Sequence, residues 1–395
     1  MTVTPESRGA LLDSVRELAP LLSQHAAGAE QERRLSPAVV EALARAGLYR
    51  LWVPREAGGL EVDPLTALAV FEAMARIDSA AAWNLTVSAS AAPFLSWLPD
   101  DGVQEIFHGP ATPVFSGGLF PPGQAVAADG GWRISGRWSF HSGCQAADWH
   151  LVSALVMQDG QPRIGPAGQP EQIIAALPAR QARVLDTWHT LGMRGTGSHD
   201  VTASDVFVPA RRAAPLLPPQ RLASAFQGPL YRIGIWLAVV GLAPTALGIA
   251  RAAIDALLAL GRTKTPNYTQ TPLHHRPVVQ AQAARAEAWL GAGRAYLHEA
   301  VREAWQAAQA GERLQLPQKV KLQLATTHAI RAAAEAVDLV HEAAGTTAIR
   351  EEQPFERHFR DVHVVTQHAF GSTSRYESAG RLLFGLEPDW AFFGY

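Results

Sequence analysis

The order of residue patterns along the chain predicts a mostly α-helical protein with a central β module. Residues 1–110 and 220–395 place apolar residues three and four positions apart, which is the period of amphipathic helices. Residues 111–213 instead alternate apolar and polar residues between turn glycines, as in "GGWRISGRWSFHSG", which is typical of strands. The βαβα alternation of a doubly wound sheet or a TIM barrel is missing from the sequence.

The N-terminal helical unit contains a recognisable helix start. "SPAVVEALARAGL" places Ser36 where an N-cap is expected and Pro37 at the first helical position. After the β module, "APLLPP" at residues 214–219 predicts a proline-rich linker.

The C-terminal unit, residues 220–395, contains long, alanine-rich amphipathic runs. Helices of this length usually pack as an antiparallel bundle. Its most apolar run, residues 236–250, is short for a membrane span, contains Pro244 and continues into Arg251. This run therefore predicts a buried core helix, and no membrane association is expected.

Composition indicates a folded globular protein. Of the 395 residues 48% are apolar and 18% are charged, and the formal net charge is −2, which gives no electrostatic reason to expect nucleic-acid binding. Cys144 is the only cysteine, so neither an intramolecular disulfide nor a cysteine zinc cluster can form, and we expect no metal site. The first twenty residues lack the pattern of a signal peptide, so a cytoplasmic location is expected.

Several common catalytic motifs are missing from the sequence. A Walker-type phosphate loop, a dinucleotide-binding G-x-G-x-x-G after a strand, a complete H-E-x-x-H and a G-x-S-x-G elbow do not occur. The chain therefore shows no motif for binding NAD(P)H.

The order of helical domain, β module and helical bundle resembles the acyl-CoA dehydrogenase fold along nearly the whole chain. This resemblance implies an N-terminal helical domain, a β-barrel-like middle domain and a C-terminal four-helix bundle. It also implies a flavin cofactor, and the resemblance is most specific in four segments.

The first segment is "GRWSFHSG", residues 136–143. It resembles the strand that lies along the flavin, on which an aromatic residue and a hydroxyl residue stand two apart and the hydroxyl reaches flavin N5. Phe140 and Ser142 hold these places, and alternate residues of a strand share a face. The alternative interpretation is an ordinary hairpin strand with a surface serine.

The second and third segments imply further flavin contacts. "WHTLGMRGTGSHDVTASDVFVP", residues 188–209, is similar to the family's glycine-rich stretch, which places Trp188, Thr196 and Ser198 near the flavin ring or phosphate. Alternatively, it is only a turn between strands. Arg262, in "LALGRTKTP", matches an arginine that reaches flavin phosphate, a task that suits the guanidinium fork.

The fourth segment, "PFERHFRDVHVVTQHAFG", resembles the part of the family that carries the base of many dehydrogenases. That base is a glutamate nine residues after the arginine, and counting nine from Arg360 gives Ala369. The other location of the base is the start of the apolar bundle helix, which reads "YRIGIWLAVVGL" and contains no Glu or Asp. The chain therefore lacks both dehydrogenase bases.

His368 lies eight residues after Arg360, a spacing that resembles the flavin-dependent monooxygenases of this fold. The resemblance implies reduced FMN or FAD supplied by a separate reductase, reaction with O2 through a C4a-hydroperoxyflavin, and a homotetramer built as a dimer of dimers. His368 would be the acid or base, since a histidine side chain, whose pKa is ordinarily ~6.5, can act as either near neutral pH. Ser142 would stabilise the oxygenated flavin.

Two alternatives and two questions stay open from the sequence. The chain could be an acyl-CoA dehydrogenase with an atypical base, or a helical scaffold that has lost catalysis. The small-molecule substrate could be a phenol, an indole, a thiophene sulfur or an amino-sugar nitrogen. Whether His363 or Cys144 takes part cannot be decided from the sequence.

Overall fold

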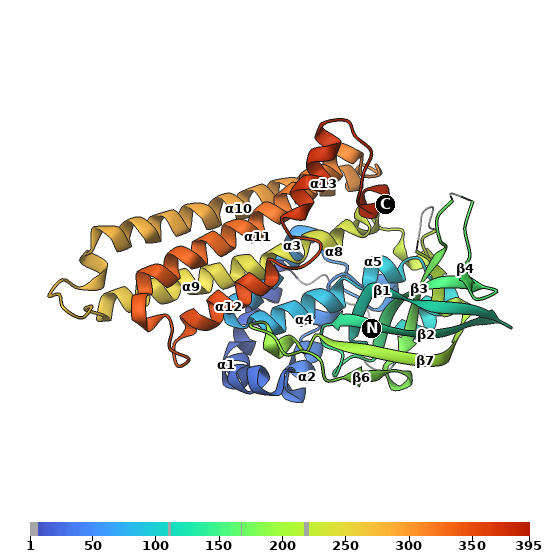
Figure 1. Ribbon diagram of the computed structural model, residues 1–395, viewed down its shortest axis with the longest axis horizontal. Coiled ribbons are helices and arrows are strands. Elements are labelled where there is room, and N and C mark those ends of the chain that lie inside the picture. The colour runs from blue at the N-terminus through green and yellow to red at the C-terminus, as the bar shows by residue number, and fades with distance from the viewer. Residues whose placement is uncertain (1–6, 110–111, 167, 217–220) are drawn as a thin grey trace.

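Helices form both ends of the chain and strands form the middle, as Figure 1 shows. The computed structural model describes residues 7–109, 112–166, 168–216 and 221–395. Residues 217–219 of the predicted linker lie outside the described residues. So does the predicted domain boundary between residues 110 and 111. The first two residues of that linker are not a linker, because they belong to strand β8.

The N-terminal helices are α1 (Arg8–Glu32), α2 (Pro37–Arg45), α3 (Pro64–Ile77), α4 (Ser79–Ala89), α5 (Ala92–Leu95) and α6 (Asp100–Phe107). The predicted start of α2 is confirmed, because Ser36 Oγ accepts a hydrogen bond from Val39 N and Pro37 is the first helical residue. Asp78 caps α4 in the same way, since its carboxylate accepts from Ala81 N at 2.7 Å. These caps fix where the helices that border the site begin.

The middle strands are β1 (Phe115–Ala128), β2 (Gly131–His141), β3 (Trp149–Gln158), β4 (Gln161–Pro162), β5 (Gln172–Pro178), β6 (Arg183–Leu185), β7 (His199–Pro209) and β8 (Ala213–Pro215). They form one sheet in the order β6-β7-β2-β1-β3-β5-β8, with β4 paired to β3. β1 and β3 run parallel, and the other neighbours are antiparallel. The sheet has its own buried cluster around Trp138, whose Nε1 donates to Ser153 O at 2.8 Å.

The C-terminal helices are α7 (Leu230–Ile233), α8 (Trp236–Val240), α9 (Ala243–Thr263), α10 (Pro277–Gln309), α11 (Leu316–Ala344), α12 (Pro354–Val365) and α13 (Ser374–Leu383). The long helices α9, α10 and α11 lie side by side, and α3 packs on α9 (Figure 1). The segment Trp236–Thr263 is long and apolar enough to cross a membrane by length and composition, but 89% of its most apolar window is buried inside the fold. The predicted core helix is therefore confirmed.

Candidate functional site

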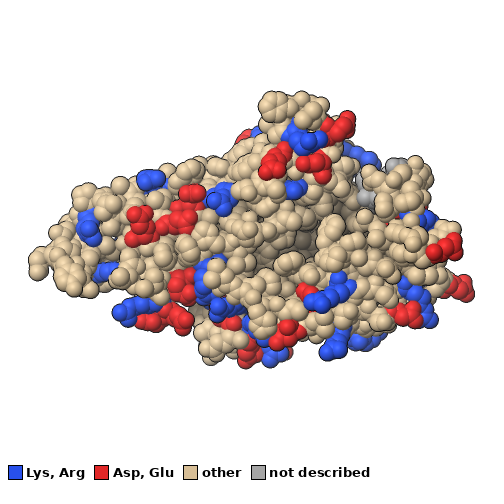
Figure 2. Space-filling model, in the orientation of Figure 1, with Lys and Arg blue, Asp and Glu red and all other residues tan. Residues whose placement is uncertain are grey.

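Two adjoining cavities lie where the N-terminal helices, the sheet and the C-terminal bundle meet. The loop cavity, named for the loop of residues 188–198 on its border, comprises about 940 Å³ of space, part of which is open to solvent. The apolar cavity, which lies over β1 and α5, comprises about 950 Å³ of space, part of which is open to solvent. Both border a common wall that consists of Val87, Gly117, Phe140, His368 and Ala369. Figure 2 shows a recess near the centre of one face with few charged side chains in it.

Uncharged residues line both cavities. Among the residues that the structure describes, no Asp, Glu, Lys or Arg lines either one. Both locations of a dehydrogenase base nevertheless lie at the cavities: Ala369 is part of the common wall, and Ala238 and Leu242 border the apolar cavity. The site therefore holds no carboxylate that could remove a proton from carbon at either location.

Phe140 and Ser142 both border the loop cavity, but not because they alternate on a regular strand. The register between β2 and β7 shifts between Trp138 and His141, and β2 ends at His141. Phe140 has a left-handed φ of 63°, and its carbonyl accepts from Ser142 N at 2.9 Å. The expected strand geometry is thus wrong, because an irregular turn, rather than the pleat, sends both side chains to one cavity.

A chain of hydroxyl groups follows one side of the loop cavity. Trp83 Nε1 on α4 donates to Ser142 Oγ at 3.0 Å, and Ser142 Oγ lies 2.7 Å from Ser198 Oγ. Ser198 Oγ lies 2.6 Å from Thr196 Oγ1, which donates to the carbonyl of Met193 at 2.7 Å. All five residues are buried. The structure thus brings together the three predicted hydroxyl residues and adds Trp83, which the sequence did not indicate.

The Arg–Asp pair of the fourth segment holds the loop that carries these hydroxyls. Asp361 Oδ1 accepts from Met193 N at 2.5 Å, and Arg360 Nη1 donates to Leu191 O at 2.7 Å. Gly192 between them packs on α12 so closely that a Cβ there would lie 2.5 Å from the carbonyl carbon of Arg360. The pair is therefore a structural anchor for the loop.

The carboxyl of Asp361 is buried within this anchor. Its Oδ2 accepts from Ser79 Oγ at 2.6 Å and lies 3.4 Å from Arg357 Nε. Burial raises the pKa of Asp361, and the nearby Arg357 guanidinium opposes that rise. The side chain is thus held between one hydroxyl, one backbone N–H and one cation.

Trp188 supplies a second indole to the loop cavity. Its Nε1 donates to Met193 O at 3.0 Å, and its backbone N donates to the buried His199 Nδ1 at 3.1 Å. Its ring meets Phe140 edge to face, with the centroids 6.2 Å apart. The loop cavity therefore combines flat aromatic walls with fixed hydroxyls, which suits a flat heteroaromatic ring that forms hydrogen bonds.

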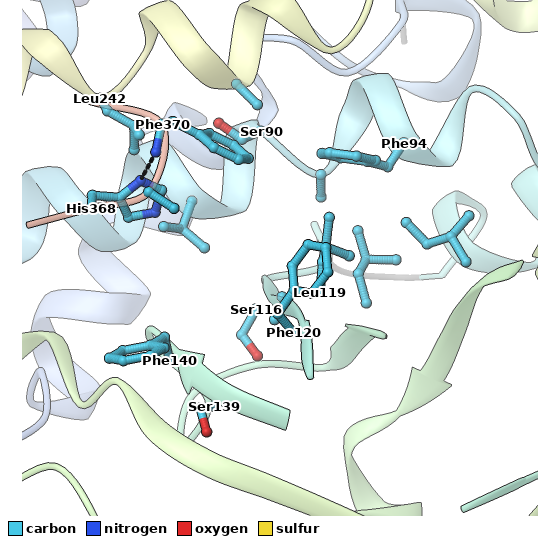
Figure 3. Close-up of a pocket in the computed structure, with 18 residues that line it drawn as sticks. Ser90, Phe94, Ser116, Leu119, Phe120, Ser139, Phe140, Leu242, His368 and Phe370 are labelled. Atoms are coloured by element: carbon cyan, nitrogen blue, oxygen red, sulfur yellow. Dashed lines mark hydrogen bonds between the residues drawn. The ribbon is translucent and has the colours of Figure 1, made fainter. Parts of the chain in front are cut away.

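His368 stands in the wall between the cavities. Figure 3 shows its ring beside Phe370, with Phe140 on the opposite side of the apolar cavity. Its Nδ1 accepts from the backbone N of Phe370 at 3.2 Å, and its ring packs edge-on against Trp83 with centroids 5.5 Å apart. Burial lowers the pKa of His368 to about 4. Its ring is therefore neutral at pH 7, and its role as acid or base stays a prediction.

The apolar cavity contains a polar group that the sequence did not indicate. Ser116 on β1 borders this cavity, and its Oγ lies 2.7 Å from His150 Nδ1 and 3.2 Å from His141 Nδ1. Burial lowers the pKa of His150 to about 4 and that of His141 well below its usual value, and His150 lowers the latter further. Both imidazoles are therefore neutral behind the serine. The pairing of β1 with β3 creates this cluster, so no local sequence motif indicates it.

Three other candidates lie apart from the cavities. Arg262 is an exposed residue at the end of α9, far from the beginning of that helix where Leu242 borders the apolar cavity, so its role as a phosphate contact stays a prediction. His363 Nε2 lies 2.9 Å from Asp338 Oδ1 and does not border either cavity. Cys144 is buried, its Sγ donates to Gly197 O at 3.3 Å, and burial raises the pKa of its thiol to about 12, which makes it a packing residue.

Comparison with known proteins agrees with this geometry. Residues 5–99 match the family model of the acyl-CoA dehydrogenase N-terminal domain, and residues 240–373 match an acyl-CoA dehydrogenase C-terminal domain. The chain is 35% identical to an indole-3-acetate monooxygenase of Pseudomonas putida, over 96% of this chain and 93% of that protein. An indole-3-acetate monooxygenase of Acinetobacter baumannii is 32% identical over 91% of this chain and 90% of its own length.

Solved structures show the same relationship. XiaF from Streptomyces sp., in complex with FADH2 and glycerol, superposes with a TM-score of 0.88 at 25% identity and covers 97% of both chains. The HsaA monooxygenase of Mycobacterium tuberculosis superposes with a TM-score of 0.86 at 24% identity, which supports the fold.

The chain belongs to the flavin-dependent monooxygenases that have the acyl-CoA dehydrogenase fold. It is the oxygenase component of a two-component system, which uses reduced FMN or FAD and O2. The loop cavity, with its two indoles and its row of hydroxyls, fits the ring of that flavin. The two alternatives that the sequence left open, a dehydrogenase and an inactive scaffold, are not supported.

Proposed function

We propose that this oxygenase transfers one oxygen atom of O2 to a small, uncharged aromatic ring, such as an indole or a phenol, held in the apolar cavity. The observation that carries the proposal is the position of His368 in the common wall of two uncharged cavities. One cavity suits a flavin, and the other is bordered by apolar side chains that include Phe94, Leu119 and Ile174. The indole-3-acetate monooxygenases among the relatives make an indole ring the first substrate to test.

The flavin, when bound in the loop cavity, supplies the activated oxygen. His368 would then act as a hydrogen-bond donor between the cavities. A neutral imidazole carries one proton, and because Nδ1 accepts from Phe370 N, that proton belongs on Nε2. We therefore narrow the role of His368 from acid or base to that of a fixed hydrogen-bond donor, whose Nε2–H would hold an oxygen atom near the substrate.

Ser142 would form a hydrogen bond with the flavin, and Ser116 would hold a polar group of the substrate. The side chains of Trp83, Trp188 and Phe94 border the cavities, are buried, and would exclude water from the reacting atoms. Water exclusion favours oxygen transfer to the substrate over release of hydrogen peroxide.

We also propose that the chain assembles as a homotetramer in the cytoplasm. The end of α13 exposes Leu383, Phe384 and Leu386, whose exposed fractions are 70%, 87% and 52%, and another copy of the chain could cover them. Light scattering coupled to size-exclusion chromatography measures the mass directly. A mass of one chain, 42.4 kDa, would contradict the assembly.

The proposed reaction is tested by oxygen-isotope incorporation. The purified chain, a flavin reductase, NADH and either FMN or FAD are supplied with ¹⁸O₂ and with indole, phenol or indole-3-acetate. Mass spectrometry should find one ¹⁸O atom in the product of at least one ring substrate. Hydrogen peroxide as the only product, with every ring recovered unchanged, would contradict the proposed substrate class.

A further inference from the structure

The hydrogen-bond chain along the loop cavity has a single possible direction, and this direction begins at the carbonyl of Met193. A carbonyl can only accept, so the hydroxyl hydrogen of Thr196 is used in its 2.7 Å bond to Met193 O. That carbonyl is fixed in place, because Asp361 holds the N–H of the same residue at 2.5 Å and Trp188 Nε1 donates to the same oxygen at 3.0 Å.

Each following hydroxyl is constrained by the one before it. Because the hydrogen of Thr196 is already used, Ser198 must donate across the 2.6 Å contact with Thr196. Because the hydrogen of Ser198 is then used as well, Ser142 must donate across the 2.7 Å contact with Ser198. Each of these hydroxyls has one hydrogen, so no alternative arrangement satisfies all three contacts.

Ser142 consequently has only a lone pair left for the cavity. Its hydrogen points to Ser198, and one of its two lone pairs accepts from Trp83 Nε1 at 3.0 Å. The remaining lone pair is the one group that Ser142 can present to a ligand in the loop cavity, which it borders. Ser142 is therefore a hydrogen-bond acceptor toward that ligand, and cannot donate to it while the chain is intact.

We propose that this fixed direction makes the loop cavity selective for reduced over oxidised flavin, with Ser198 and Thr196 as the positioning residues. The inference rests on the proposed function, in which Ser142 forms a hydrogen bond with the flavin, and on the resemblance that places this hydroxyl at flavin N5. Reduced flavin carries an N–H at N5, whereas oxidised flavin has only a lone pair there. An acceptor at this place forms a hydrogen bond with the N5–H of reduced flavin. In oxidised flavin the acceptor and N5 would face each other with lone pairs, which is unfavourable. An oxygenase component that must take up reduced flavin and release oxidised flavin benefits from this difference.

Two substitutions release the hydrogen of Ser142. In Ser198→Ala the acceptor of that hydrogen is removed. In Thr196→Val Ser198 loses its own acceptor, so it can turn and donate to Ser142. In either variant Ser142 becomes free to donate to N5 of oxidised flavin. Ser198→Thr keeps the hydroxyl and is the conservative control, and Ser142→Ala reports whether the serine faces the flavin.

The experiment measures the dissociation constants of reduced flavin, under anaerobic conditions, and of oxidised flavin for the full-length wild-type protein and each variant, with FMN and with FAD. The dissociation constant of oxidised flavin, divided by that of reduced flavin, should fall about tenfold in Ser198→Ala and in Thr196→Val. The reason is that Ser142 can then donate a hydrogen bond to oxidised flavin instead of presenting a lone pair to it. For this two-electron couple, the same change moves the midpoint potential of the bound flavin by about 30 mV. Ser198→Thr keeps the hydroxyl, so its ratio of dissociation constants should equal that of the wild type.

A wild-type ratio in both Ser198→Ala and Thr196→Val, in variants whose circular dichroism shows a folded chain, would overturn the inference. An unchanged ratio in Ser142→Ala would overturn it as well, because the serine would then not face the flavin. Failure of the wild-type chain to bind either flavin would overturn the proposed function together with the inference. That failure is distinguishable, because it appears before any substitution is made.

Discussion

The two cavities share a wall, but different interactions build them. In the loop cavity, hydrogen bonds connect α4, the end of β2, the 188–198 loop and α12, so the direction of each hydroxyl is fixed. In the apolar cavity, most of the wall is made by packed side chains of α4, α5, β1 and the bundle. Fixed hydrogen bonds can distinguish two redox states of one ring, whereas apolar walls distinguish rings mainly by size, at about 1–3 kcal/mol per methylene.

His368 belongs to both cavities and should therefore give the largest effect. His368→Ala removes the hydrogen-bond donor in the common wall, and we expect product formation to fall by about 10²- to 10³-fold. The loop cavity keeps its hydroxyl chain, so binding of reduced flavin should change little. Turnover and flavin titration measure the two properties separately.

His363→Ala is the matched control for this substitution. His363 lies on the preceding helix, is partly exposed and bonds to Asp338 outside the cavities. Its loss should leave the rate of product formation within about twofold of wild type, since surface side chains contribute little. Normal turnover in His368→Ala would show that the common wall has no part in oxygen transfer.

Asp361→Ala should affect the loop cavity more than the apolar one. The substitution leaves Met193 N without its acceptor and removes the buried carboxylate from beside the partly buried Arg357. Removal of one partner of a buried ion pair costs about 3–5 kcal/mol, although Asp78 still pairs with Arg357, so we expect the lower end. Chemical denaturation measures the loss, and reduced-flavin affinity should fall with it. An unchanged flavin affinity would mean that the anchor does not set the geometry of the loop.

Low pH should decrease the free energy of unfolding, because the buried histidines next to Ser116 become protonated. The folded pKa of His150 is about 4, below the unfolded value of ~6.5, so the unfolded state binds the proton first. Above pH ~6.5 His150 therefore does not lower the free energy of unfolding. As the pH falls from ~6.5 to ~4, the free energy of unfolding decreases by about 3 kcal/mol at most. Urea denaturation at pH 7 and pH 4.5 measures the loss, and His150→Phe should show a smaller difference between the two pH values. An equal difference in both proteins would contradict the assignment.

Ser116→Ala should give the smallest effect and should separate the two cavities most clearly. It removes one hydrogen bond to the substrate, so we expect about a tenfold rise in KM for a substrate with an N–H or O–H group. Reduced-flavin affinity should stay at the wild-type value, because Ser116 does not border the loop cavity. Steady-state kinetics and flavin titration test both expectations, and a loss of flavin affinity would contradict the division into two cavities.

The sequence was sufficient for the order of the elements and for local features. Apolar periodicity predicted helices and strands, and the Ser36-Pro37 pair predicted the start of α2. Spacing from Arg360 led to His368, which lies in the wall between the cavities. These features depend on neighbours within a few residues or on a resemblance that extends along the chain.

Features that depend on distant contacts could not be predicted. Trp83 meets Ser142 across 59 positions, and Ser116 meets His150 only because β1 pairs with β3. The turn at Phe140 breaks the alternation that the strand pattern suggested, since one residue adopts a left-handed φ. The low pKa of His368 arises from burial, which a residue pattern does not show.

The most direct test of the account is a stopped-flow experiment with the wild-type chain. The protein is mixed anaerobically with reduced FMN or FAD, then with oxygenated buffer, while the near-ultraviolet spectrum is recorded. A transient absorption band that is distinct from oxidised flavin, and that decays faster when an aromatic substrate is present, is the predicted result. Direct appearance of oxidised flavin with both cofactors, at the rate of free flavin, would contradict the claim that the two cavities work together in oxygen transfer.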